Sequence, residues 1–151
     1  MNQAVLSKPS AIFSTVSQTD ALGLYENNEF RPKHLATFLG LTNADVSHIA
    51  GVSKKSVRYD DAIPKEVMEH LEQIANICNM VAGFFGNDPR KTELWFKTKN
   101  PMLGDIAPRD MVRFGRYDKL RRFVIGALSD NAQDERAGRR QSGAVREAAA
   151  T

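Results

Sequence analysis

WFKTKNPMLGDIAPRDMVRFGRYDKLRRFVIG, residues 95–126, is the stretch that decides the fold of the C-terminal half of this chain. It predicts a short helix, a break at Asn100-Pro101 and a turn at Gly104. A second helix is expected from Pro108, because proline suits the first helical position, and a basic third helix follows. The stretch contains no catalytic constellation. A compact helical module without catalytic groups indicates a surface that binds another protein.

Upstream of this module, residues 64–85 predict a long helix that begins at Pro64. Its apolar residues recur at alternating spacings of four and three, which places them on one face. They are Val67, Leu71, Ile74, Cys78, Val81 and Phe85. Ile77, Met80 and Phe84 add a second apolar stripe. A helix that is apolar on two sides is expected to be buried in a core or in a dimer interface.

The same periodicity predicts the inward faces of the C-terminal helices. Asp88 can cap a helix that starts at Pro89, and Asp118 can cap the last helix. The residues expected to pack inward are Leu94, Trp95 and Phe96, then Met111, Val112 and Phe114, then Leu120, Phe123, Val124 and Leu128. Trp95 is the only tryptophan, and we expect it to be the central core residue of the module rather than a contact with a partner.

A candidate helix-turn-helix lies in residues 44–59, ADVSHIAGVSKKSVRY. Ala50 is small enough for two helices to touch, and Gly51 permits a tight turn between them. Ser53 is then expected to cap a third, short helix that runs through Val57 to Tyr59, with Val57 packing inward. This arrangement would turn polar and basic side chains outward toward DNA. The candidate DNA-binding residues are Ser53, Lys54, Lys55, Ser56, Arg58 and Tyr59.

The alternative interpretation of this motif is an ordinary helical hairpin with a solvated basic face. Two lysines and one arginine are few for tight DNA binding, so a dimer or further basic residues would be needed. Positive charge is concentrated in two blocks. Residues 31–63 carry five bases against three acids, and residues 86–130 carry ten against six. The second block can face DNA phosphate, an acidic partner or solvent.

Composition excludes several classes of protein. The 151 residues carry a net charge of +3, and 42% of them are hydrophobic, which allows a globular core. The single cysteine rules out a disulfide within the chain and a cysteine-based zinc site. The three histidines are not spaced as metal ligands, so neither a metal nor a cofactor is expected. Without a long apolar run or a signal peptide, the expected location is the cytoplasm.

We expect an all-α fold in five segments. A flexible arm, residues 1–30, contains a loose helix near residues 21–25 at most. The helix-turn-helix region covers residues 31–63, and the long connecting or dimerisation helix covers residues 64–85. The C-terminal helical module covers residues 86–129. Residues 130–151 are polar and alanine-rich, and we expect a frayed helix or a flexible tail there.

From about Ile63 to Gly126 the chain resembles the Xre/MbcA/ParS group of antitoxins with their C-terminal toxin-binding domain. The residues that carry the resemblance are Phe85-Gly86, Trp95, Asn100-Pro101-Met102-Leu103-Gly104, Pro108, Asp110-Met111-Val112, Gly115, Leu120 and Gly126. Order and spacing are kept throughout. Lys99 stands where many members have proline, and Phe96 where leucine is usual. These two departures bear on the identity of the partner rather than on the fold.

The resemblance implies an antitoxin of a type II toxin–antitoxin system, with no catalytic role of its own. Such proteins bind a co-encoded RES-like toxin, which consumes NAD or transfers ADP-ribose from it, and repress their own operon at operator DNA. They commonly form homodimers, and their terminal residues block the active site of the toxin. The candidate toxin-binding residues, on the turn and the arginine-rich helices, are Asn100, Pro101, Met102, Leu103, Arg109, Arg113, Arg116 and Arg122.

Two other functions stay open at the level of sequence. The chain can be a stand-alone helix-turn-helix regulator whose C-terminal region serves for dimerisation or sensing. It can also be a small enzyme, although no phosphate-binding loop, nucleophile elbow or carboxylate pair stands out.

Overall fold

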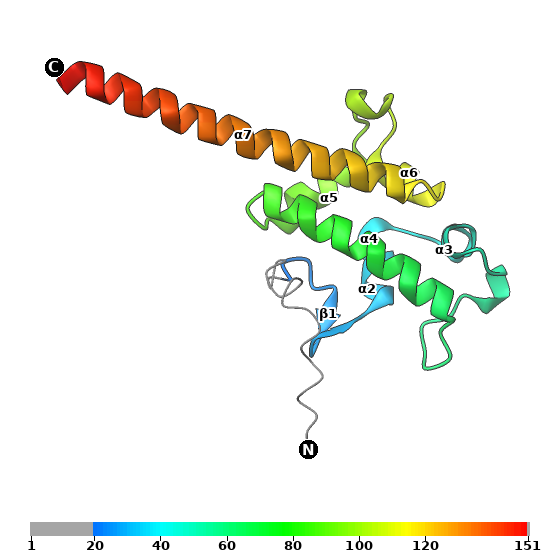
Figure 1. Ribbon diagram of the computed structural model, residues 1–151. Coiled ribbons are helices and arrows are strands. Elements are labelled where there is room, and N and C mark those ends of the chain that lie inside the picture. The colour runs from blue at the N-terminus through cyan, green and yellow to red at the C-terminus, as the bar shows by residue number, and fades with distance from the viewer. Residues whose placement is uncertain (1–19, 151) are drawn as a thin grey trace.

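The computed structural model describes residues 20–150, with side chains described for residues 20–138 (Figure 1). Almost all regular structure in this range is helical, as predicted. A hairpin of β1 (Tyr25–Glu26) and β2 (Glu29–Phe30) precedes helices α2 (Pro32–Leu39) and α3 (Asn43–Ala50), the 3₁₀ turn η2 (Lys54–Ser56) and helix α4 (Lys65–Phe84). Then follow α5 (Pro89–Lys97), the 3₁₀ turn η3 (Pro101–Leu103), α6 (Pro108–Arg113) and α7 (Tyr117–Ala150). None of the helices in the described range is long and apolar enough to cross a membrane.

Helix α4 is the centre of the structure. Its predicted apolar face is buried, with Val67, Leu71 and Ile74 fully inaccessible to solvent. Helices α2, α3, α5 and α7 all pack against it (Figure 1). One continuous apolar cluster extends from Leu24 in the hairpin to Val124 in α7. The segments expected at residues 31–63, 64–85 and 86–129 therefore share a single core.

The predicted flexible arm needs correction over residues 20–30. These residues form the hairpin, not a loose helix, and they bury Leu24 completely. Asn27 and Asn28 both have positive φ, 53° and 66°, which suits the two-residue turns that join antiparallel strands. The Asp20 carboxylate accepts hydrogen bonds from the backbone N–H groups of Leu24 and Tyr25, both at 2.9 Å. Residues 1–19 of the predicted arm lie outside the described residues.

Of the two alternatives expected for the C-terminal segment, a frayed helix or a flexible tail, the structure shows a helix as far as Ala150. Helix α7 does not end near residue 129 but continues to Ala150, which makes it longer than α4. Every residue from 129 to 138 is exposed, and the helix projects beyond the bundle (Figure 1). Alanine, arginine, glutamate and glutamine dominate this segment, and all four are strong helix formers. Helical propensity, rather than an apolar face, accounts for the continuation.

Two apolar residues that were predicted to pack inward, Leu94 and Phe114, are exposed. Phe96 is fully buried, whereas Leu94 is 67% exposed and Trp95 is half-buried. Phe96 therefore replaces Trp95 as the central core residue, and its ring makes an edge contact with Phe38 of α2 at 6.5 Å. Phe114 is 57% exposed because α6 ends at Arg113, before the expected face can continue.

Candidate functional site

The turn at residues 100–104, here called the Met102 turn, is held by a dense set of backbone interactions. The Asn100 side chain accepts a hydrogen bond from the Met102 N–H at 2.9 Å and so caps η3. Asn100 also forms an isolated antiparallel bridge with Ile106. Gly104 has a φ of 76°, a conformation that a side chain would disfavour. The turn is therefore a preorganised feature rather than a loose connection.

The Met102 turn presents an apolar side chain to solvent. Met102 is 79% exposed, while Leu103 next to it is partly buried against the core. A flexible, polarisable methionine on a rigid turn is well suited to fill a pocket on another protein. This combination is the strongest binding feature among the predicted toxin-binding residues.

Only one of the four predicted toxin-binding arginines is exposed without an ion pair in the described part of the chain. Arg113 binds Asp45 at 3.3 Å and Asp110 at 3.2 Å. Arg122 pairs with Asp118 at 3.1 Å. The guanidinium of Arg109 packs over Gly40, at the C-terminal end of α2, and a Cβ added at that glycine would lie 3.3 Å from it. Arg116, which is exposed, is the exception.

Arg113 joins α6 to the capping box of α3. Thr42 accepts a hydrogen bond from the Asp45 N–H, and the Asp45 carboxylate accepts one from the Thr42 N–H at 2.9 Å. Desolvation alone would raise the pKa of Asp45. The hydrogen bonds from Thr42 and the ion pair with Arg113 outweigh it and lower the pKa below its usual range. Arg113 thus acts within the fold rather than as a free contact.

This network predicts a loss of stability in acid. A carboxyl group with a depressed pKa in the folded state stabilises the protein above its unfolded pKa, which is about 3.9. That stabilisation is lost as the pH falls from about 5 through the folded pKa of Asp45. In the Asp45→Asn variant, the free energy of unfolding should therefore fall less steeply as the pH is lowered than it does in the wild-type protein. Urea unfolding between pH 7 and pH 2.5 measures this dependence.

The matched control is Asp105→Asn, a carboxyl-to-amide change on an exposed loop residue. Asn tolerates the positive φ of 60° that Asp105 adopts. The same flattening in both variants would argue against a specific role of Asp45 and Arg113.

The candidate DNA-binding segment differs from its prediction. The prediction of a third helix, running from Ser53 through Tyr59, is wrong. Only the three-residue turn η2 forms, and the chain becomes extended at Val57, whose side chain is buried. Val57 is buried from this extended backbone, and the exposed Arg58 side chain next to it pairs with Asp60. A three-residue 3₁₀ turn is about 6 Å long, too short to lie along a major groove as a recognition helix.

The predicted DNA-binding residues differ in their exposure to solvent and in whether their charge is paired. Ser53, Lys54 and Lys55 are exposed, and the Ser53 hydroxyl lies 2.7 Å from the Ser56 hydroxyl. We call residues 53–56 the basic turn. The charge of Arg58 is matched by Asp60. Tyr59 is half-buried, and burial raises its pKa.

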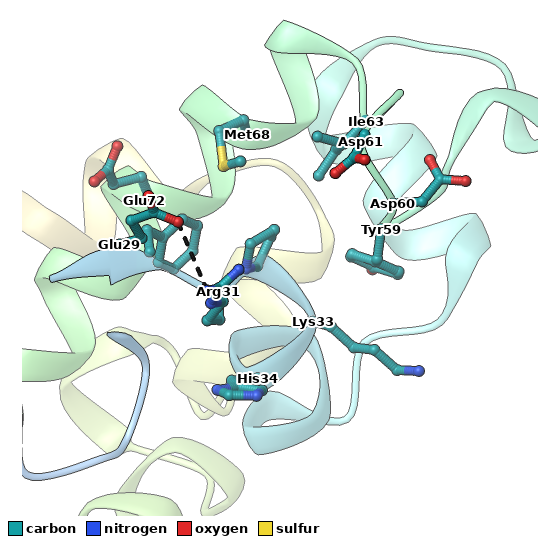
Figure 2. Close-up of a pocket in the computed structure, with 12 residues that line it drawn as sticks. Glu29, Arg31, Lys33, His34, Tyr59, Asp60, Asp61, Ile63, Met68 and Glu72 are labelled. Carbon is teal, nitrogen blue, oxygen red and sulfur yellow. Dashed lines mark ion pairs between the residues drawn. The ribbon is translucent and has the colours of Figure 1, made fainter. Parts of the chain in front are cut away.

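A groove that the sequence did not predict lies beside Tyr59 (Figure 2). Its volume is about 560 Å³, and it is bounded by the hairpin, the start of α2, residues 59–63 and α4. Figure 2 shows Arg31 in the middle of the groove, paired with Glu29 at 3.6 Å. The charged lining residues are Arg31, Lys33, Glu29, Asp60, Asp61 and Glu72, and His34 lies among them. Because the lining contains both basic and acidic side chains, it favours neither an anionic nor a cationic ligand. The groove depends on the hairpin, so no local sequence signal pointed to it.

A second, smaller groove is almost wholly apolar. It lies where α4 ends beside α5 and α7, and its volume is about 140 Å³. Its aromatic and aliphatic lining is Val81, Phe84, Phe85, Trp95, Phe123, Val124, Ala127 and Leu128. Trp95 thus forms a wall of this surface, which we call the apolar groove.

Other chemistry is limited within the part of the chain that the structure describes. It contains no group of three or more histidine, cysteine or acidic residues that could hold a metal ion. Cys78 is fully buried in α4, and burial raises the pKa of its thiol. Cys78 is therefore a packing residue with little thiolate character.

Comparison of the chain with protein-family models, with curated proteins and with solved structures found no match.

Proposed function

We propose that this protein is the antitoxin of a type II toxin–antitoxin system and that it inhibits a RES-like toxin by direct binding. The observation that carries the proposal is the Met102 turn, a preorganised loop that presents an apolar side chain on the module with the sequence resemblance. Exposed Phe114 and Arg116 on the same module extend the candidate contact surface. In this proposal the toxin carries the catalytic groups, and the antitoxin inhibits it by binding a surface of complementary shape and charge.

Co-expression with the product of the adjacent gene is the most direct experiment. We expect a stable complex and loss of NAD consumption or ADP-ribosylation by the partner, whereas the isolated chain should turn over no NAD. If no RES-like protein is encoded nearby, or none co-purifies, the toxin half of the proposal fails. NAD turnover by the isolated chain would instead assign catalysis to this protein.

The proposal includes repression of the protein's own operon, with the basic turn as the DNA contact. Lys54 and Lys55 lie side by side in sequence and are both exposed, which suits contact with phosphates. Without a recognition helix, these contacts neutralise charge more than they read bases. A stand-alone regulator is the alternative, and it would bind upstream DNA and regulate transcription without any protein partner.

The double variant Lys54→Ala/Lys55→Ala should weaken DNA binding and reduce its salt dependence. Each phosphate contact that is lost lowers the slope of log K against log salt by about 0.9. Fluorescence anisotropy with the upstream DNA at 50–200 mM salt (about a fourfold range) measures both effects. The control is Lys91→Ala/Lys119→Ala, which removes the same charge from exposed positions on α5 and α7. An unchanged slope of log K against log salt in the Lys54→Ala/Lys55→Ala variant would show that the basic turn does not contact DNA phosphates.

A further inference from the structure

The apolar groove between α4, α5 and α7 is only partly covered by the side chains that line it. Phe84 is 51% exposed, and Trp95 is half-buried. The groove volume of about 140 Å³ is close to that of an apolar cavity (about 150 Å³) that binds benzene. One large apolar side chain of a partner would therefore fill it. Asn100 also lines the groove, so the groove adjoins the Met102 turn.

Two carboxylates continue the α7 side of this groove. Phe123 and Ala127 line the groove, and Asp130 and Asp134 follow Ala127 at spacings of three and then four residues. Residues at positions i, i+4, i+7 and i+11 share one face of a helix, so these four form a single stripe. Helix α7 projects beyond the bundle here, and both aspartates are exposed (Figure 1). We call Asp130 and Asp134 the acidic pair.

The acidic pair is an unfavourable arrangement within α7 itself. Like charges four residues apart on a helix repel each other and destabilise it. Residues 130–135 contain three acids and no base, whereas residues 136–146 contain four bases and no acid. Arg136, the first of these bases, lies about 160° around the helix from Asp134 and does not face the pair. A cation supplied by another molecule would relieve the repulsion.

The geometry of this surface selects a helix as its occupant. Helices α4, α5 and α7 form its walls, and their backbone groups are paired within each helix, so no sheet edge is open to an added strand. From Ala127 to Asp134 the stripe advances by seven residues, about 10 Å, which equals about two turns of a helix lying beside α7. Such a helix would meet the groove with apolar residues and the acidic pair with basic residues two turns away.

We propose that the apolar groove and the acidic pair together bind an amphipathic helix of a partner protein. This helix carries large apolar side chains at positions i and i+4 and lysine or arginine at i+7 and i+11. The apolar side chains fill the groove beside Trp95, and the basic side chains pair with Asp130 and Asp134. The inference does not rest on the proposed function, because it requires neither a toxin nor contact with Met102.

The fluorescence of Trp95 in the purified full chain tests the inference, because Trp95 is the only tryptophan and lines the groove. The probe is a synthetic alanine-based peptide of about 18 residues, long enough to be partly helical. It carries leucines at i and i+4 and lysines at i+7 and i+11, and it is made in both sequence directions. We expect saturable binding of one direction, with a blue shift of the emission and protection from quenching by acrylamide.

Unchanged Trp95 emission with both peptides would overturn the proposal. That result is expected if a second copy of the chain, or residues 1–19 of the same chain, already covers the groove.

Altered peptides test the pattern of the partner helix. One has glutamates in place of the lysines, and another has the lysines on the opposite face, at i+5 and i+9. Each should bind at least about tenfold more weakly at about 50 mM salt. Alanines in place of the leucines should abolish the change in Trp95 emission. Equal binding by the original peptide and either lysine-altered peptide would exclude the acidic pair from the site.

Charge reversal in the chain tests the same contact from the other side. The Asp130→Lys/Asp134→Lys variant should bind the lysine peptide at least about tenfold more weakly and should bind the glutamate peptide instead. The control, Asp61→Lys/Glu66→Lys, makes the same change in charge at exposed positions near the start of α4, at the opposite end from the groove. It should leave binding unchanged. Equal affinity of both variants for the lysine peptide would contradict the proposal.

Discussion

Replacing Met102→Asp is expected to abolish neutralisation of the toxin while leaving the antitoxin folded. Met102 is 79% exposed and held by a rigid turn, so its replacement removes a contact with a partner and little of the core. A carboxylate at the centre of a protein interface loses its hydration without gaining a partner. We expect affinity for the toxin to fall by at least 100-fold, about 3 kcal/mol, as measured by titration calorimetry and by toxin activity.

Leu94→Asp is the matched control for this prediction. Leu94 is also an exposed aliphatic residue, but it lies on α5 and outside the Met102 turn. We expect this variant to bind the toxin within about threefold of the wild-type affinity, a difference of under 1 kcal/mol. Equal losses in both variants would mean that the interface covers α5 or that any added charge disturbs it. Full neutralisation by the Met102→Asp variant would refute the assignment of the turn.

Replacing Phe96→Ala is expected to destabilise the fold more than any other single truncation in the C-terminal module. Phe96 is fully buried, packs beside α2 and α4, and makes edge contacts with Phe38 and Trp95. Truncating a buried phenylalanine costs about 3–5 kcal/mol, which is a large part of the about 5–15 kcal/mol that stabilises a typical domain. Urea unfolding should show a lower midpoint with an unchanged slope.

The neighbours of Phe96 provide internal comparisons. Leu94→Ala should change the free energy of unfolding by less than about 0.5 kcal/mol, because the side chain is already in water. The loss of free energy of unfolding in Trp95→Ala should lie between the losses in Leu94→Ala and Phe96→Ala, since Trp95 is half-buried at the wall of the apolar groove. If Trp95→Ala proved more damaging than Phe96→Ala, the sequence expectation would be right and the assignment of Phe96 as the central core residue would be wrong.

Much of the helical framework is local and was predicted from the sequence. The starts of α2, α5 and α6 follow from Pro32, Pro89 and Pro108, each at a first helical position. Asp88 caps α5 as expected, and its carboxylate accepts hydrogen bonds from the Arg90 and Lys91 N–H groups. These features depend on groups within one helical turn of each other, so a linear pattern is enough to identify them.

The candidate binding residues were predicted less well, because ion pairs and packing between distant segments decide their exposure. Arg113 looked like a surface charge until α3 brought Asp45 within 3.3 Å. The helix expected through Tyr59 did not form; Val57 is buried as expected, but from an extended backbone. Leu94 and Phe96 are both apolar, and the packing of α5 against α2 and α4 decides which one is buried.

The sequence by itself determined the helical class, the helix starts and the Met102 turn, since proline, glycine and capping side chains act on their own neighbours. It also determined the charge segregation of residues 130–146. Only the tertiary structure decided that Phe96 rather than Trp95 is central, that Arg113 serves the fold, and that Met102 faces solvent. Burial depends on contacts between helices that are far apart in the chain, and no local pattern records those contacts.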